Sequence, residues 1–157
     1  MPNWCSNRLV ITGLTEPQQD KIAKALLEEE LLETFIPTPD GVDAYDHHCE
    51  EWGTKWDVGG SEIYSEKGEL QSYFESAWSP PVQGLTAISS QFPDAEFRLE
   101  YNEPGMAYCG VARFTNGECD DSYIDYAAIP GVSDLDFDTD DVSEQLETLV
   151  DEWISDQ

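Results

Sequence analysis

Hydrophobic and polar residues alternate in several short runs of the chain, and a period of two residues predicts β-strands. The clearest run is 96–101, in which Phe97, Leu99 and Tyr101 alternate with charged residues. The other predicted strands are 3–12, 61–66, 69–77, 107–114 and 118–126. Asn116-Gly117 is the usual sequence of a type I′ hairpin turn, so the last two strands are expected to pair.

Two segments carry apolar residues at the spacing of a helix that covers a sheet. The first is expected to begin at Thr15, which forms a capping box with Gln18, and to run to about residue 30. The second covers 82–91, with Ser79 as its expected cap. The segment between them, 35–60, is rich in Pro and Gly, and its two tryptophans four residues apart predict a long loop that folds onto the domain.

A third helix is predicted near the end of the chain, with Asp138 or Thr139 as its cap. Its apolar residues have a period of 3.6 and form one stripe: Val142, Leu146, Leu149, Val150 and Trp153. We expect this helix to dock on the rest of the protein through that stripe, because an exposed stripe of this size would promote association.

The order of these elements is β-α-β-β-α-β, followed by a β-hairpin and the last helix. The order of the first six elements predicts the split βαβ topology of a ferredoxin-like α+β sandwich, an antiparallel sheet with two helices on one face. We expect residues 1–126 to form this domain, including the 35–60 loop and the hairpin extension. Residues 127–157 are expected to form an acidic linker and a helix docked on the same domain.

Charge excludes several classes of partner. The 157 residues include 34 Asp and Glu but 7 Lys and Arg, so the formal net charge is −27. Such a surface repels nucleic acid and anionic lipid, whose binding needs clustered basic residues. The sequence contains no run of about 18 apolar residues, so we expect no transmembrane helix. The first residues have no basic and apolar regions of a signal peptide, so we expect a cytoplasmic protein.

Cysteine and histidine give one candidate metal site. The four cysteines lack CxxC spacing and are expected to be reduced thiols that behave mostly as small buried hydrophobes. His47, His48 and Cys49 are zinc-type ligands, but adjacent residues rarely converge on one ion. The competing interpretation is a solvated loop, and we expect no metal and no cofactor.

Several uncommon motifs occur together in a fixed order, and most contain tryptophan. They are Met1-Pro-Asn-Trp-Cys-Ser-Asn7, Trp52-Gly-Thr-Lys-Trp-Asp57, Ala77-Trp-Ser-Pro-Pro81, Phe92-Pro93 and Glu103-Pro-Gly-Met106 followed by Gly110. Over about residues 1–115 the chain therefore resembles the YubB-like ferredoxin-like domain family of plasmids, phages and prophages. The resemblance implies a ferredoxin-like fold and a mobile-element setting, and it implies no catalytic residues.

The tryptophans of these motifs have two interpretations. Trp4, Trp52, Trp56 and Trp78 are expected to be core or loop-anchoring residues, because large aromatic side chains dominate the energetics of burial. The alternative is an aromatic platform for a ligand. Lys55, between two tryptophans, is expected to stack on a ring or to be solvated rather than to act in catalysis.

The acidic residues are concentrated toward the end of the sequence. Residues 114–157 hold 14 acids and no base, whereas residues 1–113 hold 20 acids and all 7 bases. The candidate partner-binding residues are the acids that accompany the last helix: Asp120, Asp121, Asp134, Asp136, Asp138, Asp140, Asp141, Glu144, Glu147 and Asp151. Within this set, 140, 144, 147 and 151 have the spacing of one helix face.

Four explanations of this acidity remain open: mimicry of a phosphate backbone, salt adaptation, calcium binding and solubility. The calcium-loop pattern is absent, because Thr139 stands where Gly belongs and Gln145 where Glu belongs. We predict a non-enzymatic DNA mimic that inhibits a basic, nucleic-acid-binding host defence protein of the restriction or CRISPR type. The alternative is an interaction or scaffold protein whose acidity serves solubility or salt adaptation. No nucleophile elbow, HExxH or Gly-rich phosphate loop supports an enzyme, and the oligomeric state is not predicted.

Overall fold

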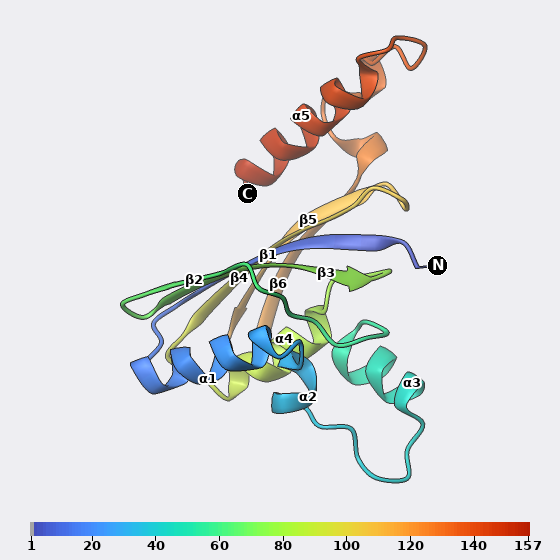
Figure 1. Cartoon of the computed structure of the whole chain (residues 1–157). Coiled ribbons are helices and arrows are strands. Elements are labelled where there is room, and N and C mark those ends of the chain that lie inside the picture. Colours follow the sequence, from blue (N-terminus) through green and yellow to red (C-terminus); the bar gives the residue numbers. More distant parts are fainter. Residues whose placement is uncertain (1) are drawn as a thin grey trace.

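The computed structural model describes residues 2–157, and its centre is one antiparallel sheet of six strands (Figure 1). The strands are β1 (Trp4–Thr12), β2 (Ile63–Glu66), β3 (Glu69–Ala77), β4 (Glu96–Glu103), β5 (Tyr108–Thr115) and β6 (Glu118–Asp125). Their order in the sheet is β2-β3-β1-β4-β5-β6. The first four strands have the arrangement expected of a ferredoxin-like domain, and the β5–β6 hairpin extends the sheet beyond β4. The predicted fold class is therefore confirmed.

The helices lie on both faces of the sheet (Figure 1). The face toward the bottom of the view is covered by α1 (Glu16–Leu27), α2 (Leu31–Phe35), α3 (Ala44–His47), η1 (His48–Trp52) and α4 (Val82–Ser90). The opposite face carries α5 (Val142–Ser155), which rises away from the sheet at an angle. Two short 3₁₀ turns, η2 (Tyr126–Ala128) and η3 (Val132–Asp134), connect β6 to α5.

The two faces have separate hydrophobic cores. The larger core lies between the sheet and the helices α1 and α4, and it contains alternate residues of the central strands, such as Leu9 of β1 and Leu99 of β4, both fully buried. The smaller core lies under α5 and consists of Cys109, Tyr126, Ile129, Val132 and Val150. Leu146, Leu149 and Trp153 pack against it while partly exposed, so the apolar stripe of α5 docks on the sheet.

The predicted helix starts are correct at one helix and wrong at two. The capping box of α1 is confirmed, because Thr15 and Gln18 each accept a hydrogen bond from the other's backbone N–H. Ser79 does not cap α4; its hydroxyl donates to the carbonyl of Gly53 at 2.6 Å. Thr139 and Asp138 do not cap α5, which begins after Asp141 without a side-chain cap. Before α4 a tertiary contact takes the expected capping hydroxyl, whereas before α5 the hydroxyl of Thr139 donates to the nearby carbonyl of Asp136 at 2.8 Å.

The first helix ends three residues earlier than predicted. Glu28 is the last residue in helical geometry, and Glu29 adopts a left-handed conformation with φ of 57°. The chain then turns into α2, whose first backbone N–H groups, of Leu32 and Glu33, donate to the carboxylate of Asp57. A carboxylate that lies 24 residues from Glu33 along the chain therefore satisfies N–H groups in the first turn of α2.

The segment 35–60 contains more structure than the predicted loop. It includes α3 and η1, which follow each other without a break from 44 to 52. Trp52 is 2% exposed, and its indole N–H donates to the carbonyl of Ile36 at 3.0 Å. The expectation that this segment folds onto the domain is confirmed for Trp52.

Candidate functional site: an acidic arm and a tyrosine cavity

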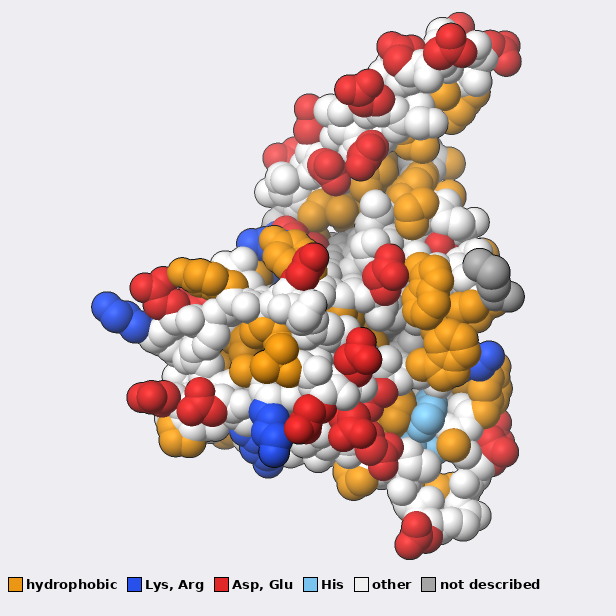
Figure 2. Space-filling model, in the orientation of Figure 1, with side chains coloured by type: hydrophobic (Ala, Val, Ile, Leu, Met, Phe, Trp, Pro, Cys, Tyr) orange, Lys and Arg blue, Asp and Glu red, His pale blue; other side chains and the backbone are white. Residues whose placement is uncertain are grey.

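The structure places most of the predicted acidic residues on one projecting part of the molecule. Residues 127–157, which we call the acidic arm, hold ten acids and no base, and all ten acids are exposed. Figure 2 shows acidic side chains spread along this arm, with no Lys or Arg visible on its outer part. The arm is therefore a surface of uniform negative charge.

Three of the four residues expected to form an acidic stripe lie on α5. Glu144, Glu147 and Asp151 are exposed and have the spacing of one helix face, on the side of α5 away from the centre of its apolar stripe. Asp140 does not belong to this stripe, because α5 begins only at Val142. It lies instead in the acidic segment that precedes the helix, together with Asp134, Asp136, Asp138 and Asp141.

The two acids predicted on β6 point to opposite faces of the sheet. Asp120 is paired with Arg113 on the face that carries α5. Asp121 is paired with Ala112 on the other face, where it accepts a hydrogen bond of 2.6 Å from the hydroxyl of Tyr101. The structure therefore does not bring Asp121 together with the acidic arm.

Three of the seven basic residues lie on the sheet face below α5. Arg8 and Arg98 form ion pairs with Glu100 at 3.1 and 2.5 Å. Burial alone would raise the pKa of Glu100, but the hydrogen bonds and charges of Arg98 and Arg8 outweigh it and hold that pKa below its usual range. The guanidinium of Arg113 donates to the backbone oxygen of Gln157 at 2.5 Å. Arg8 and Arg98 are engaged within the body of the protein, and Arg113 contacts the backbone of the last residue of the arm, so none of the three pairs with an acidic side chain of the arm.

The tryptophan motifs form an exposed aromatic surface as well as a buried anchor. Trp4, Trp56 and Trp78 are 42%, 43% and 46% exposed, so of the two expected roles, core or loop-anchoring, the core role is wrong for these three and holds for Trp52. The rings of Trp4 and Trp56 lie 5.9 Å apart. The ammonium of Lys55 lies 4.8 Å from the centre of the Trp56 ring, which confirms the predicted stacking of a cation on tryptophan.

His47, His48 and Cys49 do not form a solvated loop. The ring of His48 stacks on Trp52 at 3.7 Å, and its two nitrogens contact the Lys55 carbonyl and the Thr38 hydroxyl. His48 therefore holds the 35–60 segment together. Among residues 2–157, no group of three or more His, Cys, Asp or Glu side chains is arranged to hold a metal ion.

We expect the purified protein to contain less than about one-tenth of an equivalent of zinc per chain. The reason is that His48 already has two protein partners and Cys49 is exposed away from a converging ligand set. Elemental analysis of the wild type and of His47→Ala and Cys49→Ala checks this. One zinc per chain that is lost in either variant would show that a metal site exists.

The buried cysteines behave as predicted. Cys5 and Cys109 are fully buried, and burial raises the pKa of the Cys5 thiol to about 12 and that of Cys109 to about 11. Both thiols therefore remain protonated and weakly nucleophilic at neutral pH. Cys49 and Cys119 are exposed, so the expectation of burial holds for two of the four cysteines.

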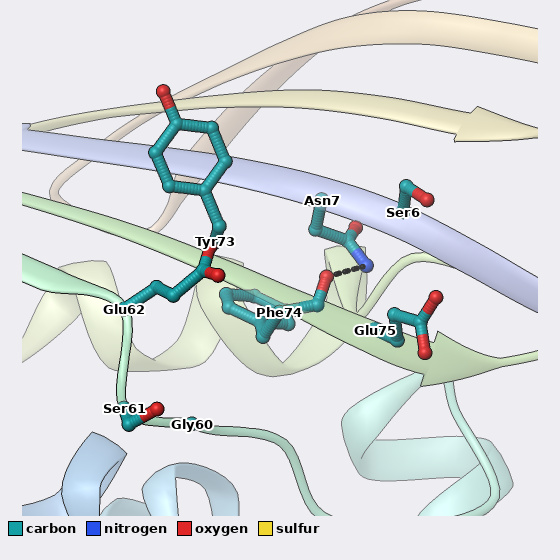
Figure 3. Close-up of a pocket in the computed structure, with 8 residues that line it drawn as sticks. All are labelled: Ser6, Asn7, Gly60, Ser61, Glu62, Tyr73, Phe74 and Glu75. Carbon is teal, nitrogen blue, oxygen red and sulfur yellow. Dashed lines mark hydrogen bonds between the residues drawn. The ribbon is translucent and has the colours of Figure 1, made fainter.

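One hollow in the surface lies beside β3, next to the segment that leads into β2 (Figure 3). It has a volume of about 380 Å³ and is lined by Ser6, Asn7, Gly60, Ser61, Glu62, Tyr73, Phe74 and Glu75. The amide nitrogen of Asn7 is held by the carbonyl of Phe74 at 3.4 Å. The hollow contains hydroxyls, an amide and carboxylates but no His, Cys or Lys.

A second hollow lies where the start of α4 approaches β5 and β6. It has a volume of about 310 Å³ and is lined by Gly53, Ser79, Pro80, Val82, Gln83, Tyr101, Tyr108, Asp121 and Tyr123. We call it the tyrosine cavity. Gly53, Ser79 and Pro80 come from two of the tryptophan motifs, which lie far apart in the sequence and meet here.

The tyrosine hydroxyls around this cavity are all engaged. Tyr101 donates to Asp121, Tyr108 donates to the carbonyl of Trp78 at 2.9 Å, and Tyr123 donates to Asp125 at 2.6 Å. Burial raises the pKa of Tyr101 and of Tyr108 above the usual range, so both phenols stay neutral. The rings of Tyr101 and Tyr108 lie 6.2 Å apart, and those of Tyr108 and Tyr123 lie 5.2 Å apart.

Sequence reasoning did not find the tyrosine cavity. Alternation placed Tyr101 on the inner face of its strand, but it did not show that Tyr108 and Tyr123 come from neighbouring strands on that face. The register supplies this, because Gly110 is the partner of both Tyr101 and Tyr123. A side chain at Gly110 would clash with the Tyr101 hydroxyl at 2.2 Å, so the glycine makes room for the cluster.

No helix in the described part of the chain, residues 2–157, is long and apolar enough to cross a membrane.

The strand order and the helices on one face define a ferredoxin-like domain, and comparison with known proteins places it in a family. Residues 51–144 match the family model described as the ferredoxin-like domain in Api92-like protein. This is more than half of the chain, and the chain belongs to that family. The match begins later than the motif resemblance over residues 1–115, and it extends into the acidic arm.

One solved structure is similar, the crystal structure of a protein api92 from Yersinia pseudotuberculosis. The two chains are 24% identical, with a TM-score of 0.48, over 63% of this chain and 40% of that one. The chain therefore matches less than half of the length of that protein. No match is found among curated proteins.

Proposed function

We propose that this protein acts by binding, and that its acidic arm presents carboxylates to the basic groove of a nucleic-acid-binding protein. The observation that carries the proposal is the location of the charge: ten acids and no base lie on one exposed, projecting segment. Solvated charge serving solubility alone does not require such segregation. A surface of one sign attracts a complementary partner and accelerates its association.

The geometry of the arm is compatible with an imitation of phosphates. Glu144, Glu147 and Asp151 follow one another at about 5 Å along the helix axis, at 1.5 Å per residue. One strand of DNA carries a phosphate about every 3.4 Å. The helix alone is therefore less densely charged than a DNA strand. The five aspartates between 134 and 141 bring the arm closer to that density.

The acids of α5 are placed against the stability of the helix. Its last turn contains no basic residue, and Asp151, Glu152 and Asp156 lie at or near its C-terminal end. Anions there interact unfavourably with the helix dipole, by roughly 0.3–1 kcal/mol each when near the surface. This unfavourable placement supports a role in binding for the charge.

We further propose that the partner is a host defence protein, a restriction nuclease or a CRISPR effector. The support for this narrower statement is the resemblance of the motifs to the YubB-like family of plasmids and phages, since mobile elements encounter nucleases that bind DNA through basic clefts. The partner-binding residues would be those of the acidic arm, with Asp120 of β6 beside them. No catalytic residue is part of this proposal.

Affinity capture tests the proposed function. The immobilised protein is exposed to the heparin-binding fraction of a bacterial lysate at about 50 and 500 mM salt. We expect it to retain nucleic-acid-binding proteins at low salt only, and we expect duplex DNA to displace them because both ligands occupy one groove. Retained proteins that DNA does not displace would contradict mimicry.

The protein itself is expected not to bind nucleic acid. With a net charge of −27, association with phosphates would bring like charges together without the counterion release that drives such binding. Mobility shifts with duplex DNA and with single-stranded RNA at about 150 mM salt should show no complex up to about 10 µM protein. A submicromolar complex would contradict the proposal.

Salt adaptation is the alternative supported by an observation, since residues 1–113 are also acidic, with 20 acids and 7 bases. The thermal midpoint of unfolding distinguishes the two explanations. For a mimic we expect a folded protein at about 50 mM NaCl and a modest rise in the midpoint as salt screens repulsion. A protein that folds only above about 1 M salt would favour salt adaptation.

A further inference from the structure

The outer edge of the sheet at β6 is open. β6 is the last strand in the order β2-β3-β1-β4-β5-β6, so no strand among residues 2–157 pairs with its outer side over Glu118–Asp125. An open edge offers a row of backbone N–H and C=O groups, on which an extended segment of another protein can form an additional strand.

The hydrogen-bond phase of the β5–β6 hairpin identifies which groups point outward. Ala107 and Tyr126 are the next opposite pair beyond the last pair of the β5–β6 ladder, Tyr108 and Asp125. The N–H of Tyr126 donates to the carbonyl of Ala107 at 2.8 Å, so this is a hydrogen-bonded pair. Hydrogen-bonded pairs alternate along an antiparallel ladder, so 118, 120, 122 and 124 bond inward to β5. The outward backbone groups therefore belong to Cys119, Asp121, Tyr123 and Asp125.

The side chains of these same four residues lie on the α4 face, where the tyrosine cavity is. Asp121 and Tyr123 line the cavity directly. Residues opposite each other in a ladder have side chains on one face, with their Cβ atoms about 5 Å apart. A residue of an added strand opposite Asp121 or Tyr123 would therefore extend its side chain beside the cavity.

The chemistry of the cavity selects a cation. Its polar groups include the carboxylate of Asp121, and no Lys or Arg lines it. The hydroxyl of Tyr101 donates to one oxygen of Asp121, and those of Tyr108 and Tyr123 donate to residues outside the cavity lining, so the three tyrosines contribute mainly ring surface. Aromatic rings attract ammonium and guanidinium groups through their quadrupole. A volume of about 310 Å³ is roughly ten times that of a water molecule and accommodates such a group.

We propose that the β6 edge binds an extended basic segment of a partner protein as a seventh strand, and that a Lys or Arg side chain of this segment enters the tyrosine cavity. Charge complementarity identifies the occupant, because Asp121 and Asp125 lie on the cavity face of β6 and the strand carries no base. The same charges oppose pairing with β6 of a second copy, since like charges opposite each other destabilise a sheet. This surface is separate from the acidic arm, and the inference does not depend on mimicry.

Nuclear magnetic resonance gives a direct test with a short peptide of alternating pattern. The probe is acetyl-Thr-Val-Arg-Val-Thr-amide, and its matched control has Gln in place of Arg. On titration into ¹⁵N-labelled protein, we expect the amide signals of Cys119, Asp121 and Tyr123 to move more than those of Asp120, Ser122 and Ile124. This alternation reports strand addition, because only the outward N–H groups gain a partner. Equal movement of both sets, or movement confined to α5, would overturn the proposal.

Variants test the cavity separately from the edge. Asp121→Asn and Tyr123→Ala should each weaken binding of the Arg peptide at least tenfold and leave the weaker binding of the Gln peptide nearly unchanged. Asp120→Asn is the matched control, since it removes the same charge from the same strand on the opposite face, and it should change binding less than twofold. Equal losses in Asp120→Asn and Asp121→Asn would show that only net charge matters and would overturn the assignment of the cavity.

A protein with a neutralised acidic arm separates this inference from the proposed function. Binding of the Arg peptide to the β6 edge should persist in that protein at about 150 mM salt. If the peptide binds at the edge while the arm variant still captures its partners, mimicry fails and the edge site stands. If arm neutralisation abolishes peptide binding, the edge site fails.

Discussion

Neutralising four acids of the arm is expected to slow association with a captured basic partner at least tenfold at low ionic strength. The substitutions are Asp140→Asn, Glu144→Gln, Glu147→Gln and Asp151→Asn. They preserve size and remove exposed charges that are expected to attract the partner before contact. Binding kinetics at about 50 and 300 mM salt measure this effect. The salt dependence of the association rate should become shallower, because fewer charges remain to be screened.

A variant that loses four charges from outside the arm tests whether the location of the charge matters or only its total. Four exposed acids of the body are suitable: Asp20→Asn, Asp40→Asn, Glu51→Gln and Glu62→Gln. This variant should associate within about threefold of the wild type. Both variants should melt at or above the wild-type temperature, since each relieves self-repulsion. An arm variant that associates as fast as the body variant would mean that the arm is not the binding surface.

A companion substitution separates the charge of α5 from its docking. Trp153→Ala removes a partly buried ring from the smaller core and is expected to destabilise the packing of α5 by about 2 kcal/mol. This is less than the 3–5 kcal/mol typical of a fully buried tryptophan, because Trp153 retains some exposure. The rate of association with the partner should fall only to the extent that α5 is displaced from the sheet. Its salt dependence should remain steep, because the acids are retained.

Trp52→Ala is expected to lower the free energy of unfolding by about 3–5 kcal/mol, the largest stability effect we predict. The side chain is 2% exposed, stacks on His48 at 3.7 Å, and holds the carbonyl of Ile36 through its indole N–H. Its backbone passes close to Gly84 of α4, where an added Cβ would lie 3.2 Å from the Trp52 carbonyl oxygen. Removal therefore loosens the whole 35–60 segment from the domain.

Trp56→Ala is the matched control, four residues further along the same motif. Trp56 is 43% exposed and contacts Trp4 and Lys55 at the surface, so we expect a loss of no more than about 1 kcal/mol. Urea unfolding followed by circular dichroism measures both values. If Trp52→Ala does not fold, Trp52→Phe replaces it, because it keeps a ring but removes the N–H. Its loss in free energy of unfolding should exceed that of Trp56→Ala and stay below the roughly 3–5 kcal/mol expected for Trp52→Ala. Equal losses in the two alanine variants would contradict the role of Trp52 as the anchor.

Elements set by short-range patterns were predictable from the sequence alone. The alternation of 96–101 requires one polar and one apolar face, and β4 buries Phe97, Leu99 and Tyr101 accordingly. The Asn116-Gly117 turn forms with φ of 45° and 84°, values that few other residue pairs adopt readily. The capping box of α1 likewise involves only residues three positions apart.

The segregation of charge was also visible in the sequence, because no base occurs after Arg113. The division of these acidic residues between two surfaces was not visible in the sequence. Asp120 and Asp121 are neighbours in the chain, yet one belongs to the α5 face and the other to the tyrosine cavity. Consecutive residues of a strand always point to opposite faces, but which face carries which helix depends on how the chain returns over the sheet.

The sequence by itself determined the six strands, the three longer helices, the order of these elements and the net charge, since each depends on residue type and near neighbours. Only the tertiary structure decided that α5 crosses to the second face of the sheet, that α1 ends where Asp57 offers acceptors to α2, and that three tyrosines from three strands surround one cavity. These features arise from contacts between residues tens of positions apart. Such contacts are set by the packing of two cores on one sheet, and no local period in the sequence encodes them.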